Sequence, residues 1–373
     1  MKLMNEGRVF LGERGSDHQS LTFPIPCITQ GGRWLCTFRG ASSKGATKGE
    51  RPLLTWSDDQ GKTWRPPFAP FAPDTVEGRP GTFRFATLTA LDDGRILAAI
   101  NWVDASEPDV PYFNEETEGL LDTRVFLSYS EDEGETWGVP RILDTDPFHV
   151  PTPLTGPILK LHNGDLACQI ELNKAYSDPA PWEHAPVMLF SEDGGESWLR
   201  YRVIAQDPDN RVFYWDQRPS VLKDGTLFNP FWTFDREASD YLNIHTRFSR
   251  DHGDTWSPLR DTGMPGQPGP AFLLEDGSLA MPVVDRSGAP QITVRRSGDD
   301  GATWPENERL VVYDSAGGTQ TEAKTSMQDA WAEMYAFSVG LPSTAPLPTG
   351  GALLVYYAGS ETNHTAIRWA EIQ

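Results

Sequence analysis

The sequence has few of the features that mark nucleic-acid-binding, membrane-spanning and disulfide-rich proteins. Of its 373 residues, 32 are Lys or Arg and 53 are Asp or Glu, which gives a formal net charge of −21. Nucleic acids and anionic membranes bind clustered basic side chains, so this balance predicts that neither is a partner. The chain also lacks any run of about 18 apolar residues, the length that a membrane-spanning helix needs.

Cysteine is scarce as well. Cys27, Cys36 and Cys168 are too few and too irregularly spaced for a disulfide framework or a zinc site. We expect buried free thiols, with a Cys27–Cys36 pair across a hairpin as the alternative. Residues 1–15 lack the apolar core of a signal peptide, because charged residues interrupt it. The lack of a signal peptide does not fix the compartment. We expect the chain as written to be cytoplasmic unless a leader was removed.

Glycine, proline and aromatic residues are abundant. The chain has 34 Gly, 31 Pro and 13 Trp, and its aromatic content is 11%. A disordered chain does not carry so many aromatic side chains, because they bury a core. Few long stretches of helical periodicity accompany them, so the composition favours all-β structure.

One octet, S-x-D-x-G-x-[ST]-W, occurs five times, at residues 57–64, 130–137, 191–198, 249–256 and 297–304. Its Asp is able to accept hydrogen bonds from backbone N–H groups of its own loop. The Gly two positions later permits a positive φ, which other residues resist. Five similar turns cannot all line one site. We therefore interpret the octets as structural turns and not as catalytic or metal-binding motifs.

Apolar stretches joined by glycine-containing turns lie between the octets and predict six β-hairpins. The sixth unit ends with the chain at residues 367–373, one strand short, and residues 6–12 supply the missing strand. Pairing a strand from each end of the chain would leave no free sheet edge. The sequence thus predicts an all-β fold, a six-bladed β-propeller with four antiparallel strands per blade, in a single domain over residues 1–373.

The octet is similar to the Asp-box, or BNR repeat, of the sialidase (neuraminidase) superfamily, and the six units resemble a sialidase-type propeller over the whole chain. This resemblance implies a site at the central axis and an exo-acting glycosidase for an acidic or modified terminal sugar. The family binds the substrate carboxylate with three arginines. It uses a Tyr nucleophile activated by a Glu, and an Asp as acid and base.

The resemblance implies catalytic candidates in the fourth, fifth and sixth blades. We assign Glu333 and Tyr335 as the nucleophile or base couple, and Asp216 or Asp285 as the proton donor. Glu333 and Tyr335 alternate with Met334, so on a strand both would face the axis. For Asp285, a surface salt bridge with its neighbour is the alternative.

Substrate-binding candidates come from the same positions. Arg39, Arg218 and Arg286 would hold an anionic group, because guanidinium forks suit carboxylates. Trp102 and Trp232 would stack on sugar faces. The remaining substrate-binding candidates are Asp235, Arg236 and His18, of which His18 has an ordinary loop histidine as its alternative.

Three positions depart from the family pattern. Pro24 stands where the family has a clamp arginine, and Phe337 stands where it has the nucleophilic Tyr. Between Arg39 and Arg51 the loop holds no Asp, and Glu50 is its only carboxylate. Two alternatives to a carbohydrate hydrolase therefore stay open, a lyase for uronate sugars and a non-catalytic propeller that binds glycan or protein. No cofactor and no metal are expected, and the oligomeric state is left open.

Overall fold

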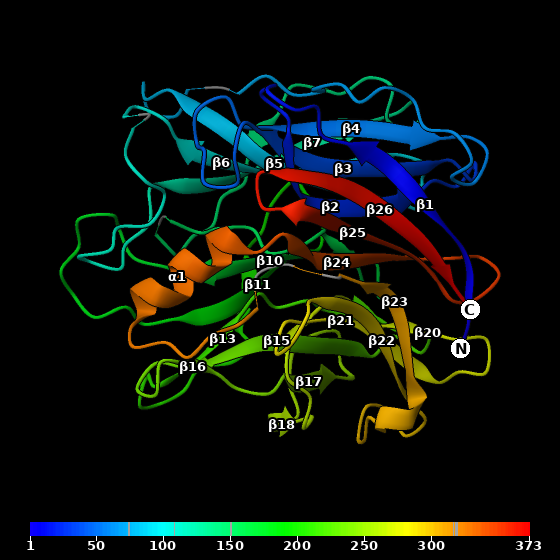
Figure 1. Ribbon diagram of the computed structural model, residues 1–373. Coiled ribbons are helices and arrows are strands. Elements are labelled where there is room, and N and C mark those ends of the chain that lie inside the picture. The colour runs from blue at the N-terminus through cyan, green and yellow to red at the C-terminus, as the bar shows by residue number, and fades with distance from the viewer. Residues whose placement is uncertain (74, 108, 150, 316, 318–319) are drawn as a thin grey trace.

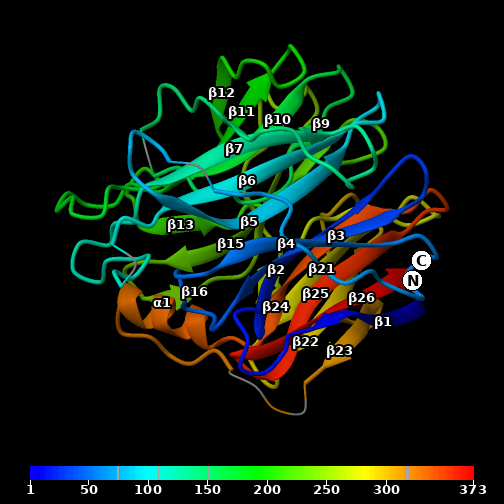
Figure 2. The ribbon, with the colours of Figure 1, turned by 90° about the horizontal axis from the view of Figure 1, so that it is seen from above.

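The computed structural model describes residues 1–373 except 74, 108, 150, 316 and 318–319. The described residues form six antiparallel sheets arranged around a common axis (Figures 1 and 2), which confirms the predicted six-bladed β-propeller. In the part of the chain that the structure describes, no helix is long and apolar enough to cross a membrane.

The first three blades follow one another along the chain. Blade 1 contains β2 (Ser20–Ile28), β3 (Trp34–Ala41) and β4 (Arg51–Ser57), with a bridge from Leu54 to Phe68 in the outermost place. Blade 2 contains β5 (Gly81–Ala90), β6 (Ile96–Asp104), β7 (Thr123–Ser130) and β8 (Arg141–Ile142). Blade 3 contains β9 (Leu159–Lys160), β10 (Leu166–Leu172), β11 (Ala185–Ser191) and β12 (Arg200–Val203).

The remaining blades contain more divided strands. Blade 4 contains β13 (Val212–Trp215), β14 (Ser220–Val221), β15 (Leu227–Asp235), β16 (Asp240–Tyr241), β17 (His245–Ser249) and β18 (Arg260–Asp261). Blade 5 contains β19 (Gln267–Pro268), β20 (Phe272–Leu273), β21 (Leu279–Asp285), β22 (Gln291–Ser297) and β23 (Arg309–Asp314), with the 3-10 helix η1 (Glu306–Glu308) before β23. Helix α1 (Met327–Ala336) precedes blade 6, which contains β24 (Val339–Pro346), β25 (Ala352–Glu361) and β26 (His364–Ile372).

The ring closes through the two ends of the chain. Strand β1 (Leu3–Leu11) pairs antiparallel with β26, and the register runs from Leu3 opposite Ile372 to Leu11 opposite Ala366. The two termini accordingly lie side by side in both views of the ribbon (Figures 1 and 2). This confirms the predicted closure of the last blade by the N-terminal strand.

Each Asp-box has the same set of hydrogen bonds. In the first, the Ser57 hydroxyl donates to Asp59 Oδ1 at 2.8 Å and accepts from the Gly61 N–H at 2.8 Å. The Thr63 N–H and hydroxyl donate to the two oxygens of Asp59 at 2.8 and 2.7 Å. These donors lower the pKa of Asp59 to about 2. The other four boxes repeat the pattern, so the octets are structural turns, as predicted.

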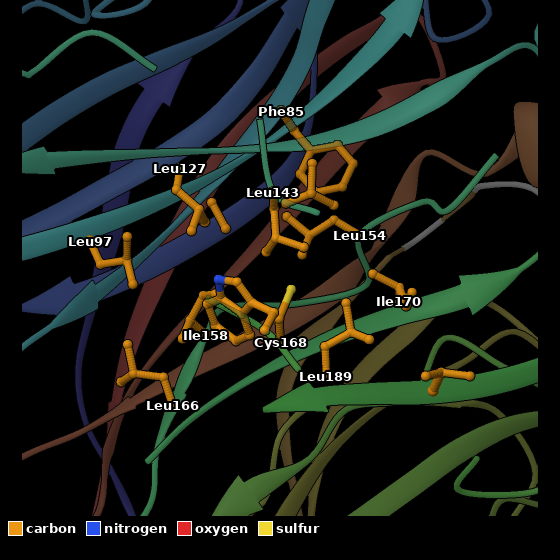
Figure 3. Close-up of a cluster of buried hydrophobic side chains, with 14 of the residues drawn as sticks. Phe85, Leu97, Leu127, Leu143, Leu154, Ile158, Leu166, Cys168, Ile170 and Leu189 are labelled. Atoms are coloured by element: carbon orange, nitrogen blue, oxygen red, sulfur yellow. The ribbon is translucent and has the colours of Figure 1, made fainter. Parts of the chain in front are cut away.

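Apolar side chains fill the spaces between neighbouring blades. Figure 3 shows one such cluster, in which Phe85, Leu97 and Leu127 of blade 2 face Leu166 and Leu189 of blade 3. The three cysteines are buried free thiols, as expected. One of them, Cys168, belongs to this cluster, and burial raises its pKa to about 12.

The Asp-box serine gives a direct test of the turn. Ser249 is 1% exposed, and its oxygen accepts from the buried Gly253 N–H at 2.9 Å. Ser249→Ala leaves that N–H without a partner, so we expect the free energy of unfolding to fall by about 1–3 kcal/mol. The urea midpoint measures the loss. Ser177→Ala, at an exposed turn, is the control, and equal midpoints for the two variants would contradict the role of the serine.

Candidate functional site

A cavity of about 230 Å³ is lined by side chains from all six blades and from α1, which places it on the propeller axis. In every blade, the innermost strand is interrupted where it reaches this cavity. β2, β5 and β24 have register shifts around Phe23–Pro24, Arg84 and Leu341–Pro342. The inner strands of blades 3, 4 and 5 are broken, and cavity-lining residues at the breaks include Gly156, Asp216, Arg218 and Pro270.

These interruptions aim side chains that a regular strand would point elsewhere. A bulge adds a residue to one strand and turns its side chain out of the alternating pattern. Phe23, Asp216 and Leu341 have positive φ angles of 52°, 52° and 48°, a region that non-glycine residues rarely occupy. All three line the cavity. The surrounding blades thus hold strained backbone at the site, as is common where function constrains geometry.

Two carboxyl groups meet in the cavity, Glu171 at the end of β10 and Asp216 directly after β13. The Asp216 N–H donates to Glu171 Oε1 at 2.5 Å. Asp216 also forms an ion pair with Arg218 at 2.9 Å and accepts from Gln267 Nε2 at 2.5 Å. Burial, and after it the negative charge of Asp216, raise the pKa of Glu171 to about 8. Glu171 therefore carries a proton at neutral pH and is able to donate it.

Arg286 lies on the wall between blades 5 and 6 and is 4% exposed. Its Nε and Nη2 donate to the Val339 carbonyl at 3.1 and 2.9 Å, and its Nη1 donates to Gln267 Oε1 at 3.1 Å. The guanidinium carbon lies 3.8 Å from the centroid of the Phe337 ring. Phe337 thus serves as a platform for an arginine.

A buried ion cluster borders the cavity on the side of blades 1 and 2. Arg39 and Glu50 have side chains with no exposed surface, and Arg39 Nε lies 2.5 Å from Glu50 Oε2. Arg84, which lines the cavity, donates to Glu50 Oε1 at 3.5 Å and lies 4.5 Å from the Tyr112 ring centroid. Arg39 also donates to the carbonyls of Lys44 and Ala46. Arg39 accordingly holds a loop, and Arg84 is the member that faces the ligand space.

Indole rings form another wall of the cavity, from Trp182, Trp215, Trp232 and Trp331. The rings of Trp215 and Trp232 lie 6.0 Å apart between centroids. Trp331 of α1 stacks on Phe113 at 4.4 Å, which joins α1 to the segment 105–122. Flat apolar rings of this kind are suited to the C–H faces of sugars.

Five of the residues predicted from the sequence line this cavity: Tyr335, Asp216, Arg218, Arg286 and Trp232. Glu333 is not among the lining residues, and the expectation that it shares a strand face with Tyr335 is wrong. Residues 327–336 form helix α1, whose first turn is capped by the Ser326 hydroxyl, which accepts from the Asp329 N–H at 3.2 Å. Glu333 pairs instead with Lys324 at 3.2 Å.

The other predicted residues lie outside the cavity lining, each with partners of its own. Trp102 has no exposed surface and packs in the core between blades 1 and 2, so its predicted contact with a sugar is wrong. The remaining residues and their partners are Asp285 with Ser287, Asp235 with Arg211, Arg236 with Glu118, His18 with Asp17, and Arg39 with Glu50. Among the described residues, no group of three metal-ligating side chains gathers at one place.

Sequence reasoning gave no role to several residues that line the cavity, namely Lys44, Arg84, Glu171, Gln267, Tyr357 and three of the four indoles. Arg84 and Gln267 stand on the inner strands β5 and β19, a position like that of Asp216, whereas Glu171 stands near the end of β10, the second strand of its blade. That signal was in the sequence. The sequence does not show which side chain an interrupted strand turns toward the cavity.

Arg39 and Arg84 share one buried carboxylate, that of Glu50, so its removal is expected to lower the free energy of unfolding. Glu50→Gln leaves Arg39 buried without a counter-ion, so we expect a loss of about 3–5 kcal/mol in the free energy of unfolding. Chemical denaturation measures this loss, with the exposed Glu116→Gln as the matched control. A loss no larger than that of the control would show that the pair does not hold the loop.

The model of the BNR repeat-like domain matches residues 109–332, and no curated protein matches the sequence. A protein of unknown function from Dyadobacter fermentans DSM 18053 is similar over 100% of this chain and 99% of its own, with 20% identity and a TM-score of 0.75.

Two sialidase structures are similar at lower identity. The Hadza microbial sialidase Hz136 covers 98% of this chain with 68% of its own, at 16% identity and a TM-score of 0.66. The intramolecular trans-sialidase from Ruminococcus gnavus covers 98% with 96% of its own, at 14% identity and a TM-score of 0.63. At these identities the similarity shows the fold alone. Because the family model spans more than half of the 373 residues, the chain belongs to the BNR repeat-like domain family, with the six-bladed propeller fold of sialidases.

Proposed function

We propose that the protein is a sialidase-like glycoside hydrolase that releases an acidic sugar from the end of a glycan in its axial cavity. The observation that carries the proposal is that one cavity holds both a proton donor and positive charge, which the hydrolysis of an acidic glycoside needs. Glu171 supplies a protonated carboxyl beside Asp216, and Arg84, Arg218 and Arg286 supply positive charge.

The size of the cavity supports exo action. Its volume of about 230 Å³ lies below the range of roughly 300–1,000 Å³ that drug-sized ligands occupy. It therefore suits one sugar unit, with the rest of the glycan outside the mouth. The indole wall would pack against the apolar face of that sugar.

In this proposal Glu171 protonates the glycosidic oxygen as the bond breaks. A general acid needs a pKa near the working pH, and the raised value of about 8 for Glu171 meets that requirement. Tyr335 stays the candidate nucleophile. The charged groups that bear on its phenol include Arg84, Arg39 and Glu50. Burial raises the pKa of Tyr335, so the hydroxyl is neutral at neutral pH, as suits attack near an anionic sugar.

The test is turnover of aryl glycosides of N-acetylneuraminate and glucuronate, together with the matching neutral sugars. We expect hydrolysis of an acidic glycoside, and a loss of roughly 10²–10⁴-fold in kcat/KM in Glu171→Gln, which cannot donate the proton. The exposed Glu131→Gln is the matched control.

The pH profile tests the same assignment. Glu171 must be protonated to act, so kcat/KM is expected to fall as the pH rises above about 8. A profile unchanged across that range would remove Glu171 from the role. An unsaturated uronate product would instead identify a lyase, and turnover of no glycoside and no uronate polymer would identify a binding propeller.

A further inference from the structure

A loop of blade 2 makes contacts with parts of the ring that do not border its own blade. This covering loop, residues 112–121, belongs to the connection between β6 and β7. Its Phe113 stacks on Trp331 of α1, and its Glu118 pairs with Arg236 of blade 4 at 2.5 Å. In a ring of six blades, blade 2 borders only blades 1 and 3. The covering loop therefore reaches these partners across the mouth of the propeller.

The covering loop also forms part of the cavity wall. Its Tyr112 and Leu120 line the cavity and are 8% and 2% exposed. Trp215 and Trp232 line the same cavity, belong to the same apolar cluster as these two residues, and are each 5% exposed. So little of each indole is accessible that a sugar cannot lie flat against it while the loop stays in place.

One side of the covering loop is fixed to blade 3 through the backbone. The Leu120 N–H donates to the Lys174 carbonyl at 3.0 Å. A Cβ on Gly119 would collide with the Ala175 carbonyl oxygen, so a glycine is needed for the two chain segments to lie this close. The loop of blade 3 and the covering loop thus form one unit on this side of the mouth.

The base of the connection is fixed by one arginine. Arg79 forms ion pairs with Asp104 at 2.7 Å and with Asp122 at 2.5 Å. These two aspartates lie at the two ends of the connection, and the Asp104 N–H donates to the Asp122 carbonyl at 2.9 Å. Because the ends are held together, a displacement of the covering loop would pivot at this point.

The other side of the covering loop, its seam with α1 and blade 4, is held by side chains. Besides the ion pair with blade 4, the Phe113 and Trp331 rings stack 4.4 Å apart, and the Gln328 amide donates to the Glu115 carbonyl at 2.7 Å. The Trp331 indole N–H is buried without a hydrogen-bond partner among the described residues. A buried donor of this kind disfavours the closed arrangement, because water would satisfy it. The seam is accordingly the weaker attachment of the loop.

We propose that the covering loop is a lid, which pivots at Arg79, opens at the seam with α1 and blade 4, and closes over a ligand in the axial cavity. On the other side of the seam, Trp331 and Tyr335 are four positions apart on α1, so they share a helix face, and both line the cavity. Closure brings the loop against the face that bears the candidate nucleophile and excludes water from it. The lid does not depend on the proposed function, which supplies only the sugars used in the test.

The test measures opening of the seam as the rate at which N-ethylmaleimide modifies a thiol buried there. Leu120→Cys places this thiol on the covering loop, and Ala330→Cys places one on α1, in the same apolar cluster. The native Cys168 is buried in the core between blades 2 and 3, so its modification reports unfolding of the ring. We expect the thiols at the seam to react faster than Cys168, because local opening leaves the sheets intact.

Removal of the ion pair at the seam is expected to favour opening. Arg236→Gln should raise the modification rate of a thiol at the seam by roughly 2–5-fold and leave that of Cys168 unchanged. Glu118→Gln is expected to have the same effect, and the two substitutions together no more than either, because both remove one interaction. Arg211→Gln is the matched control, since Arg211 pairs with Asp235 of its own blade.

Equal modification rates at the seam and at Cys168 would overturn the proposal, because the loop would then open only when the ring unfolds. Equal effects of Arg236→Gln and Arg211→Gln would also overturn it. If Leu120→Cys fails to fold, Ala330→Cys decides by the same criteria. Bound N-acetylneuraminate or glucuronate is expected to slow the modification at the seam. A seam that opens as described, but is slowed by neither sugar, would retain the lid and count against the proposed function.

Discussion

The antiparallel pairing of β1 with β26 is the contact on which the rest of the molecule depends. It joins the first and last strands of the chain in one sheet, which completes the sixth blade and closes the ring of six sheets. Only in a closed ring do the six inner strands converge on one axis. The cavity, its charges and its indole wall are therefore a consequence of ring closure, because no blade contains a site by itself.

The sequence was sufficient for the fold because the relevant interactions are local. Ser57, Asp59, Gly61 and Thr63 bond to one another within a few residues, and the same spacing returns in five boxes. The octets and hairpin turns could therefore be recognised without knowing what packs against them. Counting the strands between them was enough to predict six blades and the closing strand.

The site was predicted less completely, because it depends on where distant segments meet. The positions of Asp216, Arg218 and Arg286 in the blades predict their place in the cavity. The pKa of Glu171, in contrast, is raised by burial and by the negative charge of Asp216, which lies 45 positions further along the chain. Alternation on a strand predicts a wrong place for Glu333, because the cap at Ser326 begins a helix over Met327–Ala336. Local spacing carries no information on such long-range electrostatics.

The interruptions of the inner strands separate the residues that line the cavity from those that hold the sheets together. The pairs that hold β2 to β3 and β24 to β25 continue on both sides of the inserted residues, so the sheets do not depend on what occupies the bulge. Pro24 and Leu341 sit at two such places. A propeller built this way is able to exchange its ligand chemistry one blade at a time, while the Asp-boxes and the closing strand keep the ring unchanged. Family membership is accordingly visible in the turns, whereas part of the cavity wall is set by the residues at the bulges.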